Sequence, residues 1–185
     1  MIWLALPWWT CWILLAIGGA VFGAFANWLA DALAWQPRRI SPLFPAVPGR
    51  QRKVVEYLPI VGWLFRISDG SHHGRFFWVR PLLVELFCAV AVPLLYWWEV
   101  VQAGLVPLGV PRPSEAVLYT VYARHLLLVF FMLVASLIDW DEKLIPDSVT
   151  VPGTLLALIV AASMPASQLP HGFVPRPVFL IDDLM

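Results

Sequence analysis

Four acidic side chains and one lysine lie close together in the second half of the chain, directly after a long apolar run. They are Asp139, Asp141, Glu142, Lys143 and Asp147. An acidic residue at the end of an apolar helix is energetically expensive and usually has a function. Carboxylates placed in this way can perform general acid-base chemistry. The alternative interpretation is a solvated loop in which Lys143 neutralises its acidic neighbours.

The composition indicates that apolar helices position these residues. Hydrophobic residues make up 61% of the 185 residues and charged residues 13%, against about 45–50% and about 25% in soluble domains. Cys11 and Cys88 lie inside apolar runs, which excludes a disulfide framework or a Cys-x-x-Cys metal site. There is no glycine-rich phosphate loop, and the basic residues lie between apolar segments, which argues against nucleic-acid binding. We therefore expect an all-α, multi-pass membrane protein.

About 20 apolar residues are needed for a helix to cross a bilayer, and four segments approach this length. They are Trp8–Ala30, Pro81–Trp98, Ala116–Ile138 and Val149–Met164. The first contains a Gly19-x-x-x-Gly23 spacing, which allows another helix to approach closely. The last is shorter than the others and contains Pro152 and Gly153, so it is the weakest candidate for a full crossing.

The charge distribution predicts the orientation. Residues 35–80 contain eight Lys/Arg and two acids, a net charge of +6 (eight minus two), although the whole chain is neutral. Because short basic loops stay in the cytoplasm, we expect loop 35–80 to be cytoplasmic and the amino terminus outside. The acidic segment around Asp139 then lies at the cytoplasmic face of the inner membrane. The loop is too short and Pro-rich for an independent domain.

Residues 136–152 resemble the first active-site segment of the type IV prepilin peptidases. The shared pattern is Asp139 at a helix end, Leu144-Ile145-Pro146-Asp147 after it, and a Thr-x-Pro at Thr150 that opens the next helix. Weaker similarities follow in the family's order: Gly23-x-Phe25-x-Asn27, Glu56-x-Leu58-Pro59 with Gly62-Trp63-Leu64, and Arg80 with Val84-Glu85-Leu86.

The resemblance implies a membrane aspartyl endopeptidase that removes the leader of type IV prepilins or pseudopilins, in pilus assembly or type II secretion, without a cofactor. Asp139 would be one of two catalytic aspartates, and Asp141, Asp147 and Lys143 would support it. The structural alternative for Asp147 is the N-cap of the fourth helix. We expect Arg80 and Glu85 to form an ion pair at the start of the second predicted helix.

The sequence also departs from the family's pattern. The second aspartate of the family lies in a Gly-x-Gly-Asp segment, which does not occur here. Members usually have about eight crossings, so we expect an amino-terminal part whose other half is missing or supplied by a second chain. Residues 1–98 would be the amino-terminal part of the fold, 99–164 the beginning of the peptidase core, and 165–185 a Pro-rich tail.

Other departures concern the loop that follows the first helix. The zinc-binding cysteines of many members are absent from loop 35–80, so we expect no metal, and methylation of the new amino terminus is left open. His72 and His73 are adjacent in a Gly/Ser-rich turn and lack a third ligand, which favours solvated loop residues. Where the family has His-Arg after the asparagine of the first helix, this chain has Asp31-Ala32.

Two alternatives to a protease remain. The first is a non-catalytic membrane scaffold or assembly factor that binds pilin-like helices without cutting them. The second is a transporter or channel, suggested by Glu85, Arg124 and His125 at membrane depth.

Overall fold

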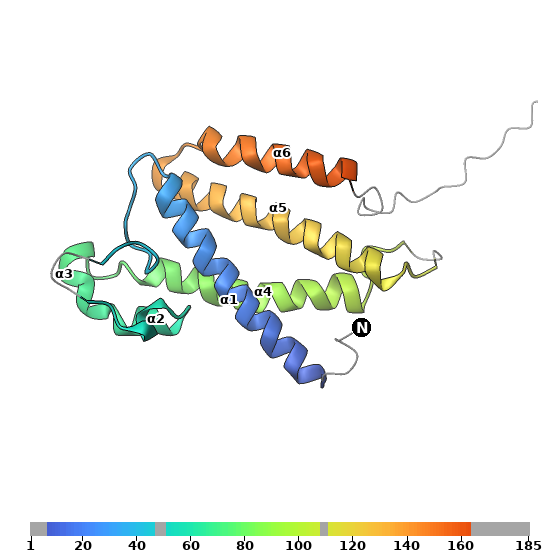
Figure 1. Cartoon of the computed structure of the whole chain (residues 1–185), viewed down its shortest axis with the longest axis horizontal. Coiled ribbons are helices and arrows are strands. Elements are labelled where there is room, and N and C mark those ends of the chain that lie inside the picture. The colour runs from blue at the N-terminus through green and yellow to red at the C-terminus, as the bar shows by residue number, and fades with distance from the viewer. Residues whose placement is uncertain (1–6, 47–50, 108–110, 164–185) are drawn as a thin grey trace, which may run out of the picture.

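The computed structural model describes residues 7–46, 51–107 and 111–163, and within them the protein is helical without strands (Figure 1). The long helices are α1 (Trp8–Leu33), α4 (Val79–Tyr96), α5 (Glu115–Glu142) and α6 (Asp147–Ser163). A π-helical segment, η4 (Trp97–Val101), continues α4. The predicted all-α class is confirmed.

Among the described residues, three helical segments are long and apolar enough to cross a membrane: α1, α4 with η4, and α5. The fourth, α6, is apolar but has only 17 residues, so a fourth crossing stays a prediction. Exposed apolar side chains such as Ile17, Phe87 and Met132 lie on these helices, as expected of surfaces that face lipid. The predicted Pro-rich tail 165–185 lies outside the described residues.

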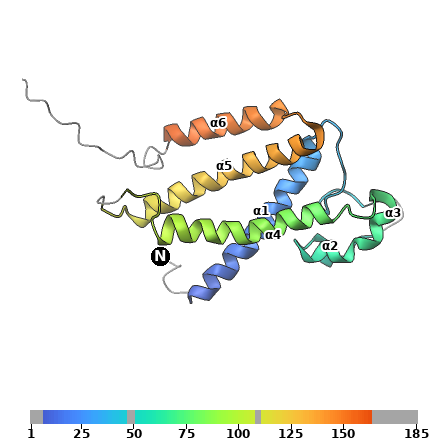
Figure 2. The same ribbon diagram turned by 180° about the vertical axis from the view of Figure 1, so that it is seen from behind.

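Successive long helices run in opposite directions, so the ends of α1 and α5 and the beginnings of α4 and α6 lie at the same side of the molecule (Figures 1 and 2). At this common end a small core joins α1, α5 and α6. Its buried residues are Ala26, Ala30, Val134, Leu137, Ile138 and Val149. Leu137 and Ile138 immediately precede Asp139, so the core fixes the helix turn that carries the acidic segment.

Helices α1 and α4 cross at a close contact formed by the predicted glycine spacing. A Cβ atom on Gly19 would lie 2.3 Å from the carbonyl oxygen of Cys88, and one on Gly23 would lie 2.9 Å from Cα of Glu85. The backbones of the two helices therefore approach too closely for any side chain at these positions. The close approach predicted from Gly19-x-x-x-Gly23 is confirmed, with α4 as the partner.

We expect Gly19→Ala to lower the free energy of unfolding by about 1–3 kcal/mol, because the new methyl group must displace the α4 backbone. Gly18→Ala is the matched control, since a Cβ atom there meets nothing within 4 Å. It should be neutral or stabilising by up to about 1 kcal/mol through helix propensity. Unfolding in mixed detergent micelles measures both. Equal effects of the two substitutions would contradict the close α1–α4 packing.

The described part of the loop between α1 and α4 contains four short helical segments. They are η2 (Val54–Tyr57), α2 (Val61–Phe65), η3 (Ile67–Asp69) and α3 (Gly70–His73). The last of these places His72 and His73 in a helical turn. The ring of His73 packs against Phe77 at a centroid distance of 5.3 Å.

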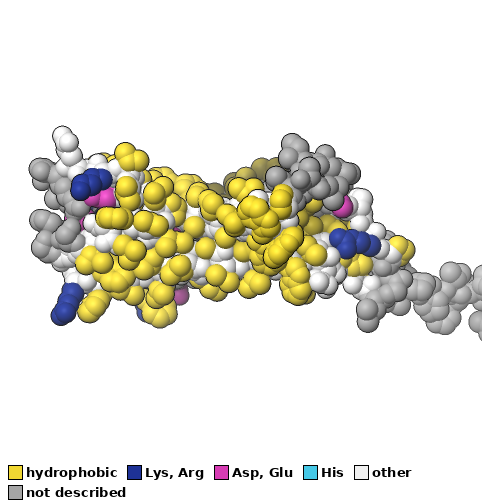
Figure 3. All heavy atoms as spheres, turned by 90° about the horizontal axis from the view of Figure 1, so that it is seen from below, with side chains coloured by type: hydrophobic (Ala, Val, Ile, Leu, Met, Phe, Trp, Pro, Cys, Tyr) yellow, Lys and Arg dark blue, Asp and Glu magenta, His cyan; other side chains and the backbone are white. Residues whose placement is uncertain are grey.

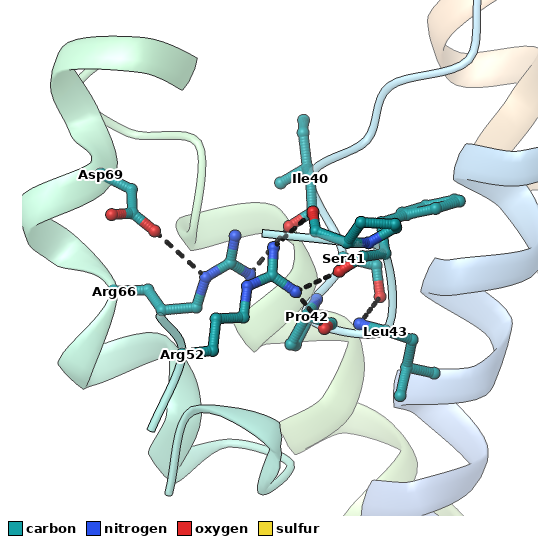
Figure 4. Close-up of polar contacts among 9 residues, drawn as sticks. Ile40, Ser41, Pro42, Leu43, Arg52, Arg66 and Asp69 are labelled. Atoms are coloured by element: carbon teal, nitrogen blue, oxygen red, sulfur yellow. Dashed lines mark hydrogen bonds and ion pairs between the residues drawn. The ribbon is translucent and has the colours of Figure 1, made fainter. Parts of the chain in front are cut away.

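Two loop arginines point into a single turn of the chain, as Figure 4 shows. Arg66 is fully buried and donates to the carbonyl oxygen of Ile40 at 2.8 Å, with Asp69 at 3.4 Å from its Nε. Arg52 donates to the carbonyl oxygens of Pro42 and Phe44. These arginines therefore satisfy backbone oxygens of a Pro-rich segment that lacks regular hydrogen bonding. Part of the loop's positive charge thus holds the loop together.

Candidate active site

Asp139 lies on the last full turn of α5, with its side chain exposed to solvent. Within the part of the chain that the structure describes, its carboxylate has neither a hydrogen-bond nor an ion-pair partner. Its carbonyl oxygen accepts a hydrogen bond from the amide of Lys143 at 2.9 Å, which closes the helix. The sequence predicted that the helix ends at Ile138, but α5 continues to Glu142. Asp139 is therefore held on a helix and not in a loop.

Asp141 faces the opposite way, because two residues correspond to about 200° of helix rotation. Its carboxylate pairs with Arg80 of α4 and, at 3.1 Å, with Arg38 from the loop. The guanidinium group of Arg80 also lies 3.9 Å from the carboxylate of Asp31, which is buried at the end of α1. Asp31 in turn accepts a hydrogen bond from the amide of Ser41 at 3.2 Å. We call Asp31, Arg38, Arg80 and Asp141 the charged network.

Glu142 holds the chain as it leaves α1. Its two carboxylate oxygens accept hydrogen bonds from the backbone amides of Trp35 and Gln36, at 2.9 and 2.8 Å. A hollow of about 400 Å³ lies beside this contact, and its lining residues are Trp35, Gln36, Asp141, Glu142 and Leu144. The two acids that follow Asp139 therefore have structural partners, whereas Asp139 has none among the described residues.

Asp147 is the first residue of α6 and is exposed. The amides of Val149 and Thr150 donate to the carbonyl oxygen of Pro146, at 3.0 and 3.3 Å. Pro146 therefore precedes the helix, and the interpretation of Asp147 as the N-cap is wrong by one residue. Asp147 still lies in the first turn of α6, where its negative charge interacts favourably with the helix dipole and stabilises the helix. The structure does not bring Asp147 into contact with Asp139.

Lys143 has a left-handed backbone conformation, with φ of 55°, where the chain turns from α5 toward α6. Its ammonium group lies 5.8 Å from the ring centroid of Trp140. It forms no ion pair with an acid in the described part of the chain. Among the described residues, Lys143 therefore pairs directly with none of the acids that the solvated-loop interpretation has it neutralise.

The predicted ion pair between Arg80 and Glu85 is also wrong. Five residues correspond to about 140° of helix rotation, so the two side chains leave α4 on different sides. Arg80 joins the charged network, whereas Glu85 is 1% exposed and accepts hydrogen bonds from the amide of Ile60 and, at 2.8 Å, from Nε1 of Trp63. Glu85 thus connects α4 to the loop helix α2.

The residues that suggested a transport path do not converge. Glu85 is bound to the loop, and Nδ1 of His125 lies 2.7 Å from the carboxylate of Glu99 in η4. Arg124 lines a groove of about 570 Å³ between α5 and α6. In the described ranges, no group of three or more His, Cys, Asp or Glu side chains is arranged to hold a metal ion.

Sequence reasoning missed Asp31 and Arg38 as parts of this region, and it identified no partner for Glu142. Arg38 and Glu142 each bind residues that are 103–107 positions away in the sequence. No local sequence pattern links positions so distant. One signal was present: a buried acid near the end of an apolar helix requires a positive partner, and Asp31 was noted only as a departure from the family.

Residues 126–180 match the model of the type IV leader peptidase family. The matched segment contains Asp139, Asp141 and Asp147, and it confirms the resemblance seen in residues 136–152. Neither the curated proteins nor the solved structures give a significant match.

Proposed function

Starting from the leader peptidase match over residues 126–180, we propose that this protein acts in leader peptide cleavage at a membrane, with Asp139 as one carboxylate of an aspartyl endopeptidase site. The observation that supports this most is the contrast at the end of α5. Asp141 and Glu142 are occupied by the charged network and by the backbone after α1, while Asp139 is exposed and unpartnered within the described residues.

An aspartyl protease needs two carboxylates that share a proton. The ionised one takes a proton from water as the water oxygen attacks the peptide carbonyl, and the protonated one donates a hydrogen bond to the carbonyl oxygen. Asp139 supplies one of them. Because the Gly-x-Gly-Asp segment is absent from this sequence, the proposal requires a second carboxylate from another polypeptide segment or chain.

The surroundings of Asp139 suit a substrate that emerges from a membrane. Trp140, Leu144 and Ile145 are exposed beside it, with Trp140 73% exposed. Such side chains can contact the apolar helix of a prepilin or pseudopilin while the polar leader reaches the carboxylate. In this proposal, loop 35–80 and Asp139 lie on the cytoplasmic side of the inner membrane, and the amino terminus lies outside.

Replacement of the chromosomal gene by an Asp139→Asn allele tests this proposal with every natural partner present. We expect processing of prepilin-like proteins to fall by at least about 10³-fold, because loss of a catalytic group leaves only binding and polarisation. Immunoblots of membrane fractions distinguish the precursor from the product. Glu115→Gln, an exposed change in the first turn of α5, is the control and should process normally. Normal processing by Asp139→Asn would refute the proposal.

The absence of a Gly-x-Gly-Asp segment favours a second candidate, a scaffold that binds pilin-like helices without cutting them. It predicts that a precursor co-purifies equally with the wild-type chain and with Asp139→Asn. It also predicts that the Asp139→Asn substitution leaves processing of the precursor unchanged. The precursor-to-product ratio in the same membranes separates the two candidates.

A further inference from the structure

The short helices η2 and α2 carry an unusual number of exposed apolar side chains for a loop. They are Val54, Tyr57, Leu58, Val61, Leu64 and Phe65, which we call the loop apolar face. The side chain of Val54 is 83% exposed, and those of the other five are about half exposed. Contiguous exposed apolar side chains on a soluble surface mark an interaction site.

This face lies beside a helix that is long and apolar enough to span a membrane. Trp63 of α2 is buried and donates to Glu85, which lies six residues after the start of α4, or about 9 Å along the helix axis. Ile60 donates to the same carboxylate. The helix α2 is therefore fixed alongside α4 and not held away from it, as both ribbon views show (Figures 1 and 2).

The apolar surface is continuous from the loop to the long helices. Figure 3 shows the face on which α2, α1 and α4 lie, and hydrophobic side chains cover most of it, with charged side chains mainly toward its two ends. A soluble loop packed on a membrane protein would interrupt this surface with polar side chains. The surface therefore continues into the same environment that surrounds α1 and α4.

Basic and aromatic side chains precede and follow the loop apolar face in the sequence. Lys53 precedes η2 and is exposed, and Arg75 follows α3 and is exposed. The guanidinium group of Arg75 lies 5.5 Å from the ring centroid of Phe76, which is 68% exposed. Basic and aromatic residues next to an apolar face are typical of segments that lie in the interface of a membrane with anionic lipids.

We infer that η2 and α2 form an interfacial element embedded in the membrane leaflet where α4 begins. The loop apolar face contacts the upper acyl chains, and Lys53 and Arg75 contact anionic lipid headgroups. Neither short helix has enough area to bind a membrane by itself, so Glu85 is needed to hold the element at this depth. The connection between α1 and α4 is then partly a membrane structure and not wholly an aqueous loop. This inference does not depend on the proposed protease activity.

A fluorescence experiment on the full chain in lipid vesicles tests the inference. In a Cys11→Ala, Cys88→Ala background, Leu64→Cys is labelled with an environment-sensitive fluorophore and compared with two matched sites. Ile17→Cys reports a lipid-facing position in the middle of α1, and Arg39→Cys an exposed basic position soon after it. Two nitroxide-labelled phosphatidylcholines, one shallow and one deep, serve as quenchers in the membrane, and iodide serves as the quencher in water.

For Leu64→Cys we expect stronger quenching by the shallow nitroxide than by the deep one, and protection from iodide. Ile17→Cys should show the reverse order of nitroxide quenching, and Arg39→Cys should be quenched mainly by iodide. Efficient iodide quenching at Leu64→Cys would overturn the inference. Protection from iodide without nitroxide quenching would overturn it as well, because a second copy of the chain or another protein would then cover the face.

The headgroup contacts are tested by changing lipid charge. Vesicles that contain phosphatidylglycerol should give stronger shallow quenching at Leu64→Cys than vesicles of phosphatidylcholine alone. A Lys53→Gln, Arg75→Gln variant should lose this difference and keep the quenching seen in the neutral lipid. Equal shallow quenching at Leu64→Cys in both lipids, with Lys53 and Arg75 unchanged, would contradict the role of anionic headgroups.

Discussion

Replacing Arg80 with methionine should lower the free energy of unfolding by about 3 kcal/mol, because it leaves two acids without their main positive partner. Asp31 is 5% exposed, the Asp141 side chain is 14% exposed, and both face Arg80. A carboxylate removed from water and then deprived of its partner is costly. Denaturation in mixed micelles, with loss of helical circular dichroism as the signal, measures the effect.

Two further variants make this prediction specific. Arg38→Met should cost no more than about 1 kcal/mol, because the Arg38 side chain is 50% exposed and its pairing with Asp141 is screened by solvent. Asp31→Asn in the Arg80→Met background should restore at least about 1 kcal/mol, since it removes one of the uncompensated charges. Additive losses in the double variant would show that Arg80 and Asp31 do not interact.

Replacing Glu85 with alanine should detach the loop from α4. The amide of Ile60 and Nε1 of Trp63 would lose their acceptor, and each unsatisfied buried donor costs about 1–3 kcal/mol. Ile60 has φ of 64° and ψ of −64° in a tight turn closed by Val61 and Pro59, a strained conformation for a β-branched residue. Without Glu85 this turn should relax, so we expect faster tryptic cleavage after Arg66, which is buried in the intact loop.

The control for this experiment is Glu85→Gln, which keeps an acceptor oxygen in nearly the same place. It should cleave at a rate between those of the wild type and Glu85→Ala. Glu115→Ala, an exposed acid in the first turn of α5, should leave the tryptic pattern unchanged. An unchanged cleavage rate after Arg66 in Glu85→Ala would mean that other contacts hold the loop.

The helices were predictable because their signal is local. Runs of apolar residues placed α1, α4 and α5 close to their observed positions, and the spacing of Gly19 and Gly23 indicated the close helix contact. The end of α5 was misplaced, since a charged residue after an apolar run looks like a helix end. Asp139 to Glu142 nevertheless remain helical, because the charged network binds Asp141 and the backbone after α1 binds Glu142.

The partners of the charged residues were not predictable in the same way. The nearest acid to Arg80 in its own helix is Glu85, and the sequence favoured that pair, but helix rotation separates them. The true partner, Asp141, is 61 residues away. Likewise, nothing local indicated that Glu85 would bind Trp63 and Ile60. Positions of this kind are decided by how the helices and the loop pack in space.

The contrast between Asp139 and Asp141 also fixes how α5 is turned about its own axis. Arg80 and Arg38 bind Asp141 from one side, so Asp139 points away from them as long as the two acids are separated by one residue. A single residue inserted after Ile138 would rotate this turn by about 100°, and the network could then be satisfied only by turning or shifting the helix. The one-residue spacing therefore works as a rotational register, through which contacts made on the far side of α5 set the direction in which the candidate catalytic carboxylate points.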